Sequence, residues 1–331
     1  SRMIRHILKK ALMALATIFV IITLSFLMVR FMPGDPLMHL VGQEEYYYLL
    51  EFNPDELERI GEKYAVSGSL GEQYVNYLRS ILTLDFGTAY SNKQPVLSNI
   101  LSSAKWTLVL TVPVMILGCI LGGILGAVAG WKPGKLFDKI ATPIFLFLNT
   151  VPSNCIGVIF LVVFAFKLKL FPLNGMTSGT ETGWKAVVDI LWHAALPIVI
   201  LTLFRTASNF MLMKSSVSQV RQEDYAVTAR SKGLSERKVM FRHVLKNAIL
   251  PYISSLCIQL GGLLSGSMVL EVIFGWKGMG QLFYNAVSSR DFPTAQACFI
   301  ISATGVVLGN LLGDTINAAI DPRVKEAQDE A

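Results

Sequence analysis

Residues 106–131 read WTLVLTVPVMILGCILGGILGAVAGW and contain no charged side chain, although a lysine flanks the stretch at each end. An α-helix rises about 1.5 Å per residue, so about 20 apolar residues cross the roughly 30 Å hydrocarbon layer of a bilayer. Gly118, Gly122, Gly126 and Gly130 recur at every fourth position. This spacing lets a second helix approach closely. The stretch therefore predicts a membrane-spanning helix that packs along a glycine stripe.

The rest of the chain has the same character. Of its 331 residues 53% are hydrophobic and 16% charged, and the mean hydropathy is +0.51. Further stretches of spanning length are residues 11–29, 140–166, 190–213, 247–270 and 292–313, of which only 190–213 is interrupted by a charge, Arg205. The predicted fold is therefore an all-α polytopic membrane protein with six transmembrane helices. Residues 11–29 exceed a signal-peptide core and no cleavage site follows, so we expect a retained anchor. Because this run is almost wholly aliphatic and has no glycine stripe, we expect it outside the core bundle.

Charge sets the expected orientation, because Lys and Arg concentrate in short cytoplasmic loops. The loop 214–246 carries eight Lys or Arg against three Asp or Glu, whereas residues 32–103 carry four against ten. Residues 1–31 then hold a cytoplasmic end and the first span, 32–103 an extracytoplasmic cap, 104–320 a five-helix core with the cytoplasmic loop, and 321–331 a cytoplasmic tail. We therefore expect a multi-pass protein of the inner (cytoplasmic) cell membrane with both termini inside. The net charge of +6 reports this topology and does not indicate a nucleic-acid partner.

The cap carries helix signals. Asn53 precedes Pro54 and is followed three residues later by Glu56, a pattern typical of a capped helix start. Aromatic and aliphatic side chains then recur at helical spacing from Tyr74 to Ile81, until Gly87 interrupts the pattern. These signals favour a small folded cap over a flexible loop.

The residues that enzymes use are not assembled into a recognisable motif. The four histidines are scattered, and no HExxH, GxSxG or CxxC pattern occurs. The sequence GWKPGK at residues 130–135 lacks the spacing and the Ser or Thr of a phosphate-binding loop. Asp314 has no second carboxylate at comparable depth in a neighbouring span. We expect no catalytic residue, no metal site and no cofactor in this chain.

Polar side chains inside the spans are costly unless they pair with one another or face water. Those expected to line a translocation pathway are Asn149, Ser153, Asn154, Ser208, Asn209, Gln259, Ser265 and Asn310. The alternative is that they hold neighbouring helices together, and the sequence leaves both open. Pro143 and Pro152 would loosen the third span and free carbonyl groups for a cavity wall.

The cytoplasmic loop contains EDYAVTARSKGLSERKV, residues 223–239. Glu223 and Asp224 suit a helix N-terminus, Gly233 ends that helix, and Ser235 begins another. An exposed pair of short helices with small residues and a tyrosine suits the groove of a cytoplasmic partner. The alternative is a basic surface helix lying on anionic lipid.

Residues 223–251, EDYAVTARSKGLSERKVMFRHVLKNAILP, closely resemble the EAA motif of permease subunits in binding-protein-dependent ABC importers. The dipeptide, oligopeptide and nickel branch is the most similar. Further matches are RFMPGDP at 30–36, QYVNYLRSILTLDFGTAY at 73–90, LEVIFGWKGMGQL at 270–282, RDFP at 290–293 and DPR at 321–323. The large segment after the first span resembles the first of the two permeases that such systems pair. The chain departs from the family pattern at Lys277, Met211 and residues 65–70.

The resemblance implies a second, similar permease, two ATPase subunits that bind ATP and magnesium, and an extracytoplasmic binding protein that delivers the substrate. That substrate would be a peptide, with nickel or a metal chelate as the alternative. The residues implied to couple to an ATPase are Glu223, Asp224, Tyr225, Ala226, Ala229, Gly233 and Leu234. A stand-alone channel or an ion-coupled carrier is the second class of function.

Overall fold

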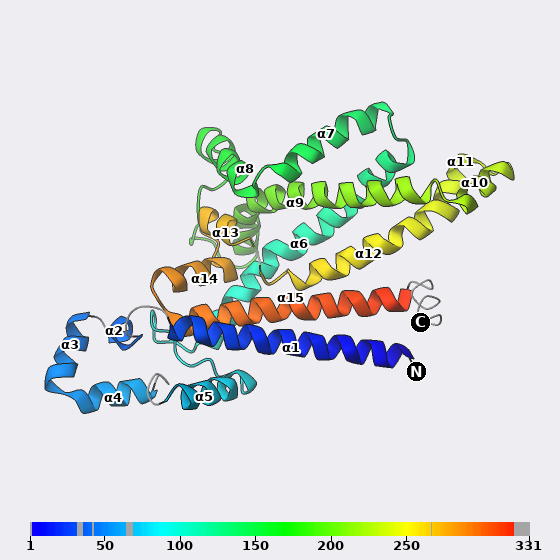
Figure 1. Ribbon diagram of the computed structural model, residues 1–331. Helices are drawn as coiled ribbons and strands as arrows, with labels where there is room; N and C mark the ends of the chain where they lie inside the picture. Colours follow the sequence, from blue (N-terminus) through cyan, green and yellow to red (C-terminus); the bar gives the residue numbers. More distant parts are fainter. Residues whose placement is uncertain (1, 32–35, 42, 64–68, 266, 321–331) are drawn as a thin grey trace.

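The computed structural model describes the chain except residues 1, 32–35, 42, 64–68, 266 and 321–331. The described residues form helices and connecting segments without a β-strand, which confirms the all-α prediction. Four helices are long and apolar enough to cross a membrane, or five if a bent pair counts as one span. The four are α1 (Arg2–Arg30), α6 (Val96–Trp131), α9 (Trp184–Val220) and α15 (Phe292–Ile320). Figure 1 shows α1 and α15 side by side at one edge of the molecule.

The third predicted span is not one straight helix. Helix α7 (Leu136–Thr150) is followed by α8 (Ser153–Phe160) and a π-helical turn η1 (Leu161–Lys167), and the two halves are bent by 100°. Pro152 caps α8 at the bend, because proline has no N–H to donate and keeps the residue before it out of the helical region. Pro143 stays inside α7, so only one of the two prolines breaks the span.

The fifth predicted span was wrong at its outer end. Helix α12 (Leu245–Gly261) stops nine residues before the predicted limit of 270, and α13 (Met268–Phe274) follows after a turn. Two consecutive glycines, Gly261 and Gly262, stand at the break, and glycine loses the most backbone freedom in a helix. At its other end α12 continues directly from α11 (Glu236–Val239) and the π-helical turn η2 (Met240–Val244).

The glycine stripes place two pairs of helices in close contact. A methyl group built on Gly122 of α6 would lie 2.5 Å from Asn209 Cβ of α9, and one on Gly130 would lie 2.6 Å from the Lys214 carbonyl oxygen. Helices α6 and α9 run parallel along this contact. On α15, Gly309 lies directly on the backbone of Gly261 in α12. Lipid provides no hydrophobic driving force between helices. Backbones this close are held together by dense van der Waals contact instead.

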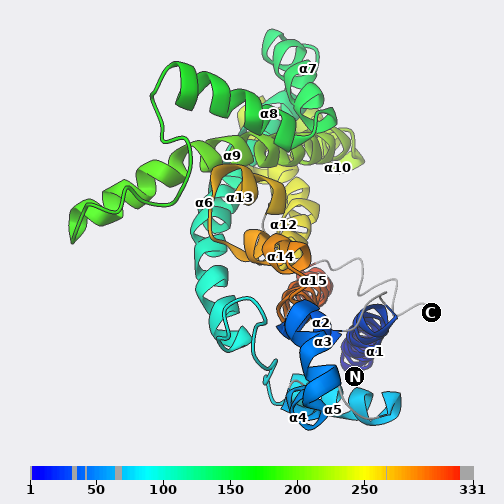
Figure 2. The ribbon, with the colours of Figure 1, turned by 90° about the vertical axis from the view of Figure 1, so that its left-hand side faces the viewer.

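Helix α1 lies outside the bundle, as expected, and its main contact is with α15 (Figure 2). The Gln296 side chain donates to the Ser25 carbonyl oxygen at 3.0 Å, and Lys10 pairs with Asp314 at 2.7 Å. Large apolar side chains cover much of the rest of α1 and are exposed in the isolated chain. They are suited to lipid or to another membrane subunit.

The segment between α1 and α6 folds into four short helices, α2 (Pro36–Val41), α3 (Gln43–Phe52), α4 (Pro54–Lys63) and α5 (Leu70–Leu82). Helix α4 begins at the predicted position, and the Asn53 amide donates to Glu56 Oε2 at 2.7 Å. Ser69 and Glu72 form a capping box at the start of α5 that the sequence analysis missed, although the S-x-x-E signal is present. The Ser69 N–H and hydroxyl lower the pKa of the Glu72 carboxyl.

A buried carboxylate organises the turn between α13 and α14 (Met279–Ser288). Glu271 is 1% exposed, and its Oε1 accepts from the Thr107 hydroxyl at 2.9 Å. Its Oε2 accepts from the Gly280 N–H at 2.8 Å, at the N-terminus of α14 where a negative charge is favourable. The Thr107 hydroxyl in turn accepts from the Met279 N–H at 2.7 Å. The contact ties the turn between α13 and α14 to α6, and the sequence analysis did not identify either residue.

We predict that Gly309→Ala weakens the fold. The added methyl group has no space beside the Gly261 backbone, so α12 and α15 must separate, at a cost of about 1–3 kcal/mol for overpacking. Thermal unfolding of the purified protein in mild detergent measures this. Gly305→Ala is the matched control, because its methyl group would lie 3.4 Å from the Gly261 carbonyl oxygen, an ordinary contact on the same helix face. Equal unfolding temperatures for the two variants would contradict the packing.

Thr107→Val should also lower the unfolding temperature. Valine keeps the shape of threonine but leaves Glu271 Oε1 and the Met279 N–H without this partner, which costs about 1–3 kcal/mol for each buried group. Thr111→Val serves as the control, since the Thr111 hydroxyl donates to the Thr107 carbonyl within α6. A larger drop in unfolding temperature from Thr111→Val than from Thr107→Val would show that the Glu271 contact does not hold the turn between α13 and α14.

Candidate functional site

The loop at residues 214–246 forms a helix, a glycine turn and a second helix, as the sequence predicts. Helix α10 (Asp224–Ser231) starts after its N-cap residue Glu223. Gly233 then adopts a φ of +73°, a left-handed conformation that favours glycine. Ser235 is the N-cap residue of α11. This unit lies at the end of the molecule where α9 ends and the run from α11 to α12 begins (Figure 1).

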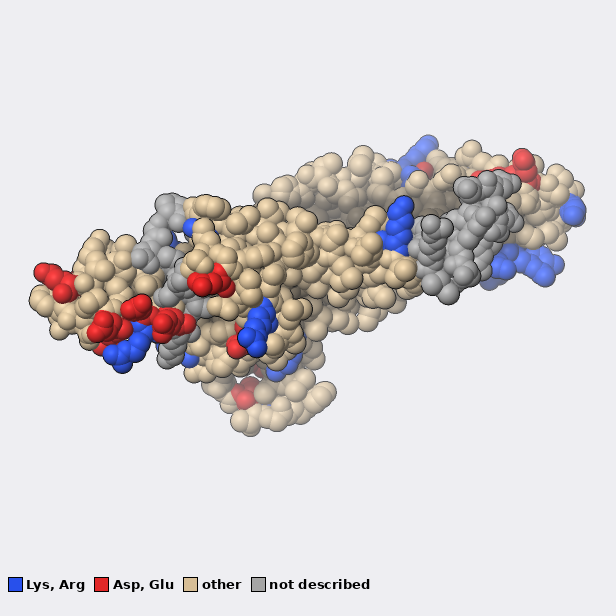
Figure 3. Space-filling view, turned by 60° about the horizontal axis from the view of Figure 1, so that its bottom comes forward, with Lys and Arg blue, Asp and Glu red and all other residues tan. Residues whose placement is uncertain are grey.

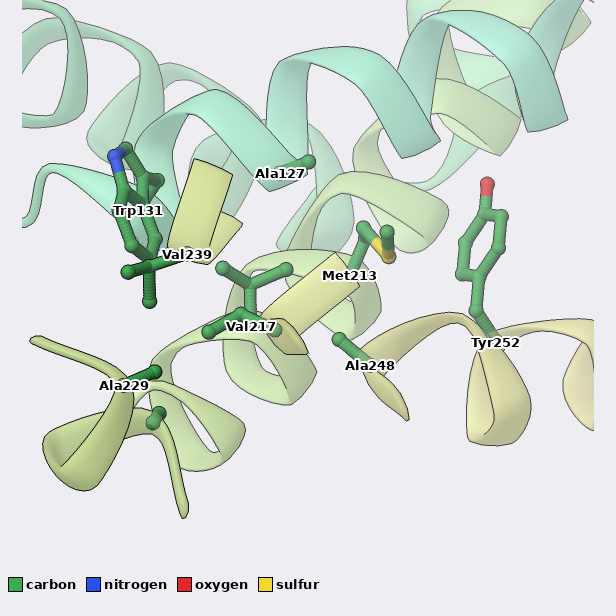
Figure 4. Packing of buried hydrophobic residues seen from close by; sticks show 10 residues of the cluster. Ala127, Trp131, Met213, Val217, Ala229, Val239, Ala248 and Tyr252 are labelled. Carbon is green, nitrogen blue, oxygen red and sulfur yellow. The ribbon is translucent and has the colours of Figure 1, made fainter. Parts of the chain in front are cut away.

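The small face of α10 points into the chain itself. Ala226 is 0% exposed and Ala229 is 5% exposed, and both belong to a cluster to which α6, α9, α10, α11, η2 and α12 contribute. Figure 4 shows the labelled members of this cluster: Ala127 and Trp131 from α6, Met213 and Val217 from α9, Ala229 from α10, Val239 from α11, and Ala248 and Tyr252 from α12. The expectation that the small residues face a partner groove is therefore corrected. They allow α10 to pack closely against its own bundle.

The outer face of α10 consists of other residues. Asp224, Val227, Thr228 and Ser231 are exposed, and Val227 retains 49% of its accessible surface. Of the predicted coupling residues, Asp224 and Gly233 are exposed, whereas Glu223, Tyr225 and Leu234 are half-buried. Tyr225 and Leu234 pack against the same cluster as Ala226.

Arg230 fastens this unit to the spans, and the sequence analysis did not single it out. Its Nε donates to Glu236 Oε1 of α11 at 3.1 Å, and one terminal nitrogen donates to the Arg221 carbonyl oxygen at 3.1 Å. The guanidinium also lies over the Trp131 ring, 5.4 Å from its centroid, a favourable cation–π arrangement. Arg221 donates to the Trp131 carbonyl oxygen at 3.0 Å. One side chain thus joins α10 to α11 and to the ends of α6 and α9.

The turn at residues 130–135 uses its backbone internally. The Gly134 N–H donates to Asp138 Oδ2 at 2.8 Å, and Asp138 pairs with Lys214 of α9 at 2.5 Å. Lys214 also donates to the Thr142 hydroxyl at 2.7 Å. The turn therefore joins α7 to α9, and a phosphate loop would need this N–H for its ligand.

Two of the predicted pathway residues are bonded to each other between helices. Gln259 of α12 donates through Nε2 to Asn209 Oδ1 of α9 at 3.0 Å, and Arg205 donates to Gln259 Oε1 at 3.0 Å. Asn209 is 1% exposed, and its amide nitrogen lies 3.6 Å from the Cys119 sulfur on α6. For Asn209 and Gln259 the structure therefore shows the helix-joining role that the sequence left open.

The other six predicted pathway residues are not gathered in one place. Asn149 lies near the end of α7, and Ser153 and Asn154 begin α8 beyond the 100° bend. Ser208 is exposed on α9, Ser265 is exposed in the turn after α12, and Asn310 is exposed on α15. Within the described part of the chain, no group of three His, Cys, Asp or Glu residues could hold a metal ion.

Comparison with known proteins assigns the family. The profile described as binding-protein-dependent transport system inner membrane component matches residues 120–326, and the profile of the N-terminal part of such membrane components matches residues 3–111.

Individual relatives cover almost the whole chain. The dipeptide transport system permease protein DppB of Lactococcus lactis is 31% identical over 325 residues, 98% of this chain and all of the relative. The oligopeptide transport system permease protein AppB of Bacillus subtilis shows the same identity and coverage. The glutathione transport system permease protein GsiC of Escherichia coli K12 is 30% identical over 323 residues, 98% of this chain and 99% of the relative. This chain belongs to the family of binding-protein-dependent transport system inner membrane components.

Proposed function

We propose that this chain is the permease subunit of an ATP-driven importer that carries peptides. The three relatives described above are named for dipeptide, oligopeptide and glutathione transport. No name among them refers to nickel, so nickel is not part of the proposal. The observation that carries the coupling role is the exposed face of α10, which is held on a buried cluster shared by α6, α9, α10, α11 and α12.

The proposed complex contains a second permease, two ATPase subunits and an extracytoplasmic binding protein. The ATPases hold ATP and magnesium, and each has a groove that accepts a short helix. In this chain the exposed residues Asp224, Val227, Thr228 and Ser231 would enter that groove, and Gly233 turns the chain back toward the membrane. Glu223, Tyr225, Ala226, Ala229 and Leu234 support α10 from behind.

Movement of α10 would reach the spans through two kinds of contact. Arg230 joins α10 to the ends of α6 and α9, and the glycine stripe holds α6 and α9 together. Closure of the ATPases would therefore shift α10, α6 and α9 as one body and change which side of the pathway is open. Hydrolysis of ATP would reset the arrangement.

The proposed topology has six crossings. The first four are α1, α6, the bent pair from α7 to η1, and α9. The fifth is the continuous run from α11 to α12, and the sixth is α15. Figure 3 shows Asp and Glu gathered at the end that α3 and α4 form, and Lys and Arg gathered at the opposite end. This separation supports a cap outside the membrane and termini in the cytoplasm.

Cysteine labelling tests the topology. In a variant without Cys119, Cys155, Cys257 and Cys298, we introduce either Glu51→Cys or Lys238→Cys, both at exposed positions. A membrane-impermeant maleimide should label Glu51→Cys in intact cells with an accessible outer face of the membrane. It should label Lys238→Cys only after permeabilisation. The cysteine-free chain is the control, and labelling of both positions in intact cells would contradict the orientation.

Val227→Asp tests the coupling surface. Val227 is the apolar side chain among the four that would enter the groove, and a charge there would have to be desolvated on docking, so the variant should reduce copurification of the ATPase subunits and lower ATP-driven peptide uptake about tenfold or more. Uptake is measured in vesicles that contain the whole complex. Val75→Asp is the control, because Val75 is a comparably exposed valine on α5, in the cap.

Normal uptake and normal ATPase recovery with Val227→Asp would contradict the docking of α10. Peptide uptake by this chain alone, without ATP, would favour the carrier function instead.

A further inference from the structure

Two charged side chains at or near the ends of the spans have an opposite charge beside them. Lys10 pairs with Asp314, and Lys214 pairs with Asp138. Arg205 is different, because none of the ion pairs found among the described residues includes it. Its hydrogen bond is to the neutral amide of Gln259, at 3.0 Å. The guanidinium has five N–H donors, so most of its capacity is left for another acceptor.

Arg205 lies deep within α9. Fifteen residues separate it from Val220 at the cytoplasmic end of the helix, a rise of about 22 Å. That depth places it inside the hydrocarbon layer, where a lone cation is costly and is retained near water or a counter-charge. The Arg205 side chain is half-buried, so part of it is exposed on the surface of this chain.

The surroundings fix the direction of the side chain. Gly118 of α6 lies directly against Arg205 Cβ and Cγ and has no room for a side chain of its own. Beyond that contact, Gln259 Oε1 accepts from the guanidinium. The Gln259 amide is itself oriented, because its Nε2 donates to Asn209 Oδ1 at 3.0 Å and to the Ser255 hydroxyl at 3.3 Å. The protein therefore holds an arginine in a set position without neutralising its charge.

We infer that Arg205 binds a carboxylate, and that this carboxylate is the free C-terminus of the transported peptide. The planar guanidinium matches a carboxylate with two parallel hydrogen bonds, whereas Gln259 occupies one donor only. The inference rests on the proposed peptide importer and adds to it a residue that recognises a chemical group common to peptides of any sequence. The Gln259 and Asn209 side chains orient Arg205, so they are positioning residues.

A carboxylate on the second permease has the same chemistry and is the other source. The two sources predict different behaviour when no peptide is present. A partner carboxylate would make Arg205 a structural contact of the complex, so Arg205→Gln would lower recovery of the second permease. If Arg205 binds the peptide carboxylate instead, Arg205→Gln leaves assembly of the empty complex unchanged.

The test uses the whole complex in vesicles, its binding protein, and two probes, trialanine and trialanine amide. Each uptake rate is divided by the fraction of binding protein loaded with that probe, which removes selection by the binding protein. Arg205→Gln should reduce trialanine uptake about tenfold or more, the loss expected for one charged hydrogen-bonded pair. Uptake of the amide should change little. Ser216→Ala is the matched control, because it removes another hydrogen bond between α9 and α12, from the Ser216 hydroxyl to the Ala248 carbonyl oxygen at 2.7 Å, without touching Arg205, and it should affect both probes equally.

An equal loss of both probes in Arg205→Gln would overturn the inference while the proposed function stands. Reduced recovery of the second permease in the empty complex would assign the carboxylate to that subunit and also overturn it. If the unchanged complex carries neither probe, the proposed function fails, and the assignment of a peptide carboxylate fails with it.

Discussion

The close approach of α6 and α9 is the constraint on which the rest of the structure depends. Lipid offers no hydrophobic driving force between helices, so contact must come from dense packing, and the glycines of α6 provide it. The same contact sets the register of α9. It places Val217 in one cluster with Trp131 at the end where α10 is attached, and places Arg205 over Gly118 further along the two helices. The glycine stripe of α6 therefore positions both the proposed coupling surface and the proposed carboxylate site.

Carboxylates form a second layer of organisation, because each buried one joins two elements. Asp291 accepts from the Ser91 N–H and hydroxyl at 3.1 and 2.7 Å and lies at the start of α15. Glu271 of α13 places its carboxylate at the start of α14 and contacts α6, and Asp138 lies in the first turn of α7 and contacts α9. In each case the helix N-terminus offers free N–H groups and a favourable potential. A buried carboxylate would be costly alone, but these three are stabilised because hydrogen-bond donors surround them where two elements meet.

The sequence predicted the features that depend on run length and on local backbone preference. Apolar runs located α1, α6, α9 and α15, and Gly233 marked the turn after α10. It did not predict the bend after α7, because proline is tolerated in some spanning helices, and Pro143 and Pro152 look alike in the sequence.

It also did not show that Ala226 and Ala229 face inward, since helical spacing identifies a face without identifying what covers it. The bond between Asn209 and Gln259 joins residues 50 positions apart. Only the fold brings such residues together.

The contacts of α1 bear on how the chain is made. Ser25 and Gln296 are 271 residues apart, and Ser91 and Asp291 are 200 apart. A ribosome adds about 5–20 residues per second, so α1 and the cap exist for many seconds before α15 has been synthesised. Helix α1 therefore has its main partner in a helix that is made much later, and the segment between α1 and α6 gains its contact with Asp291 only when synthesis has reached the start of α15.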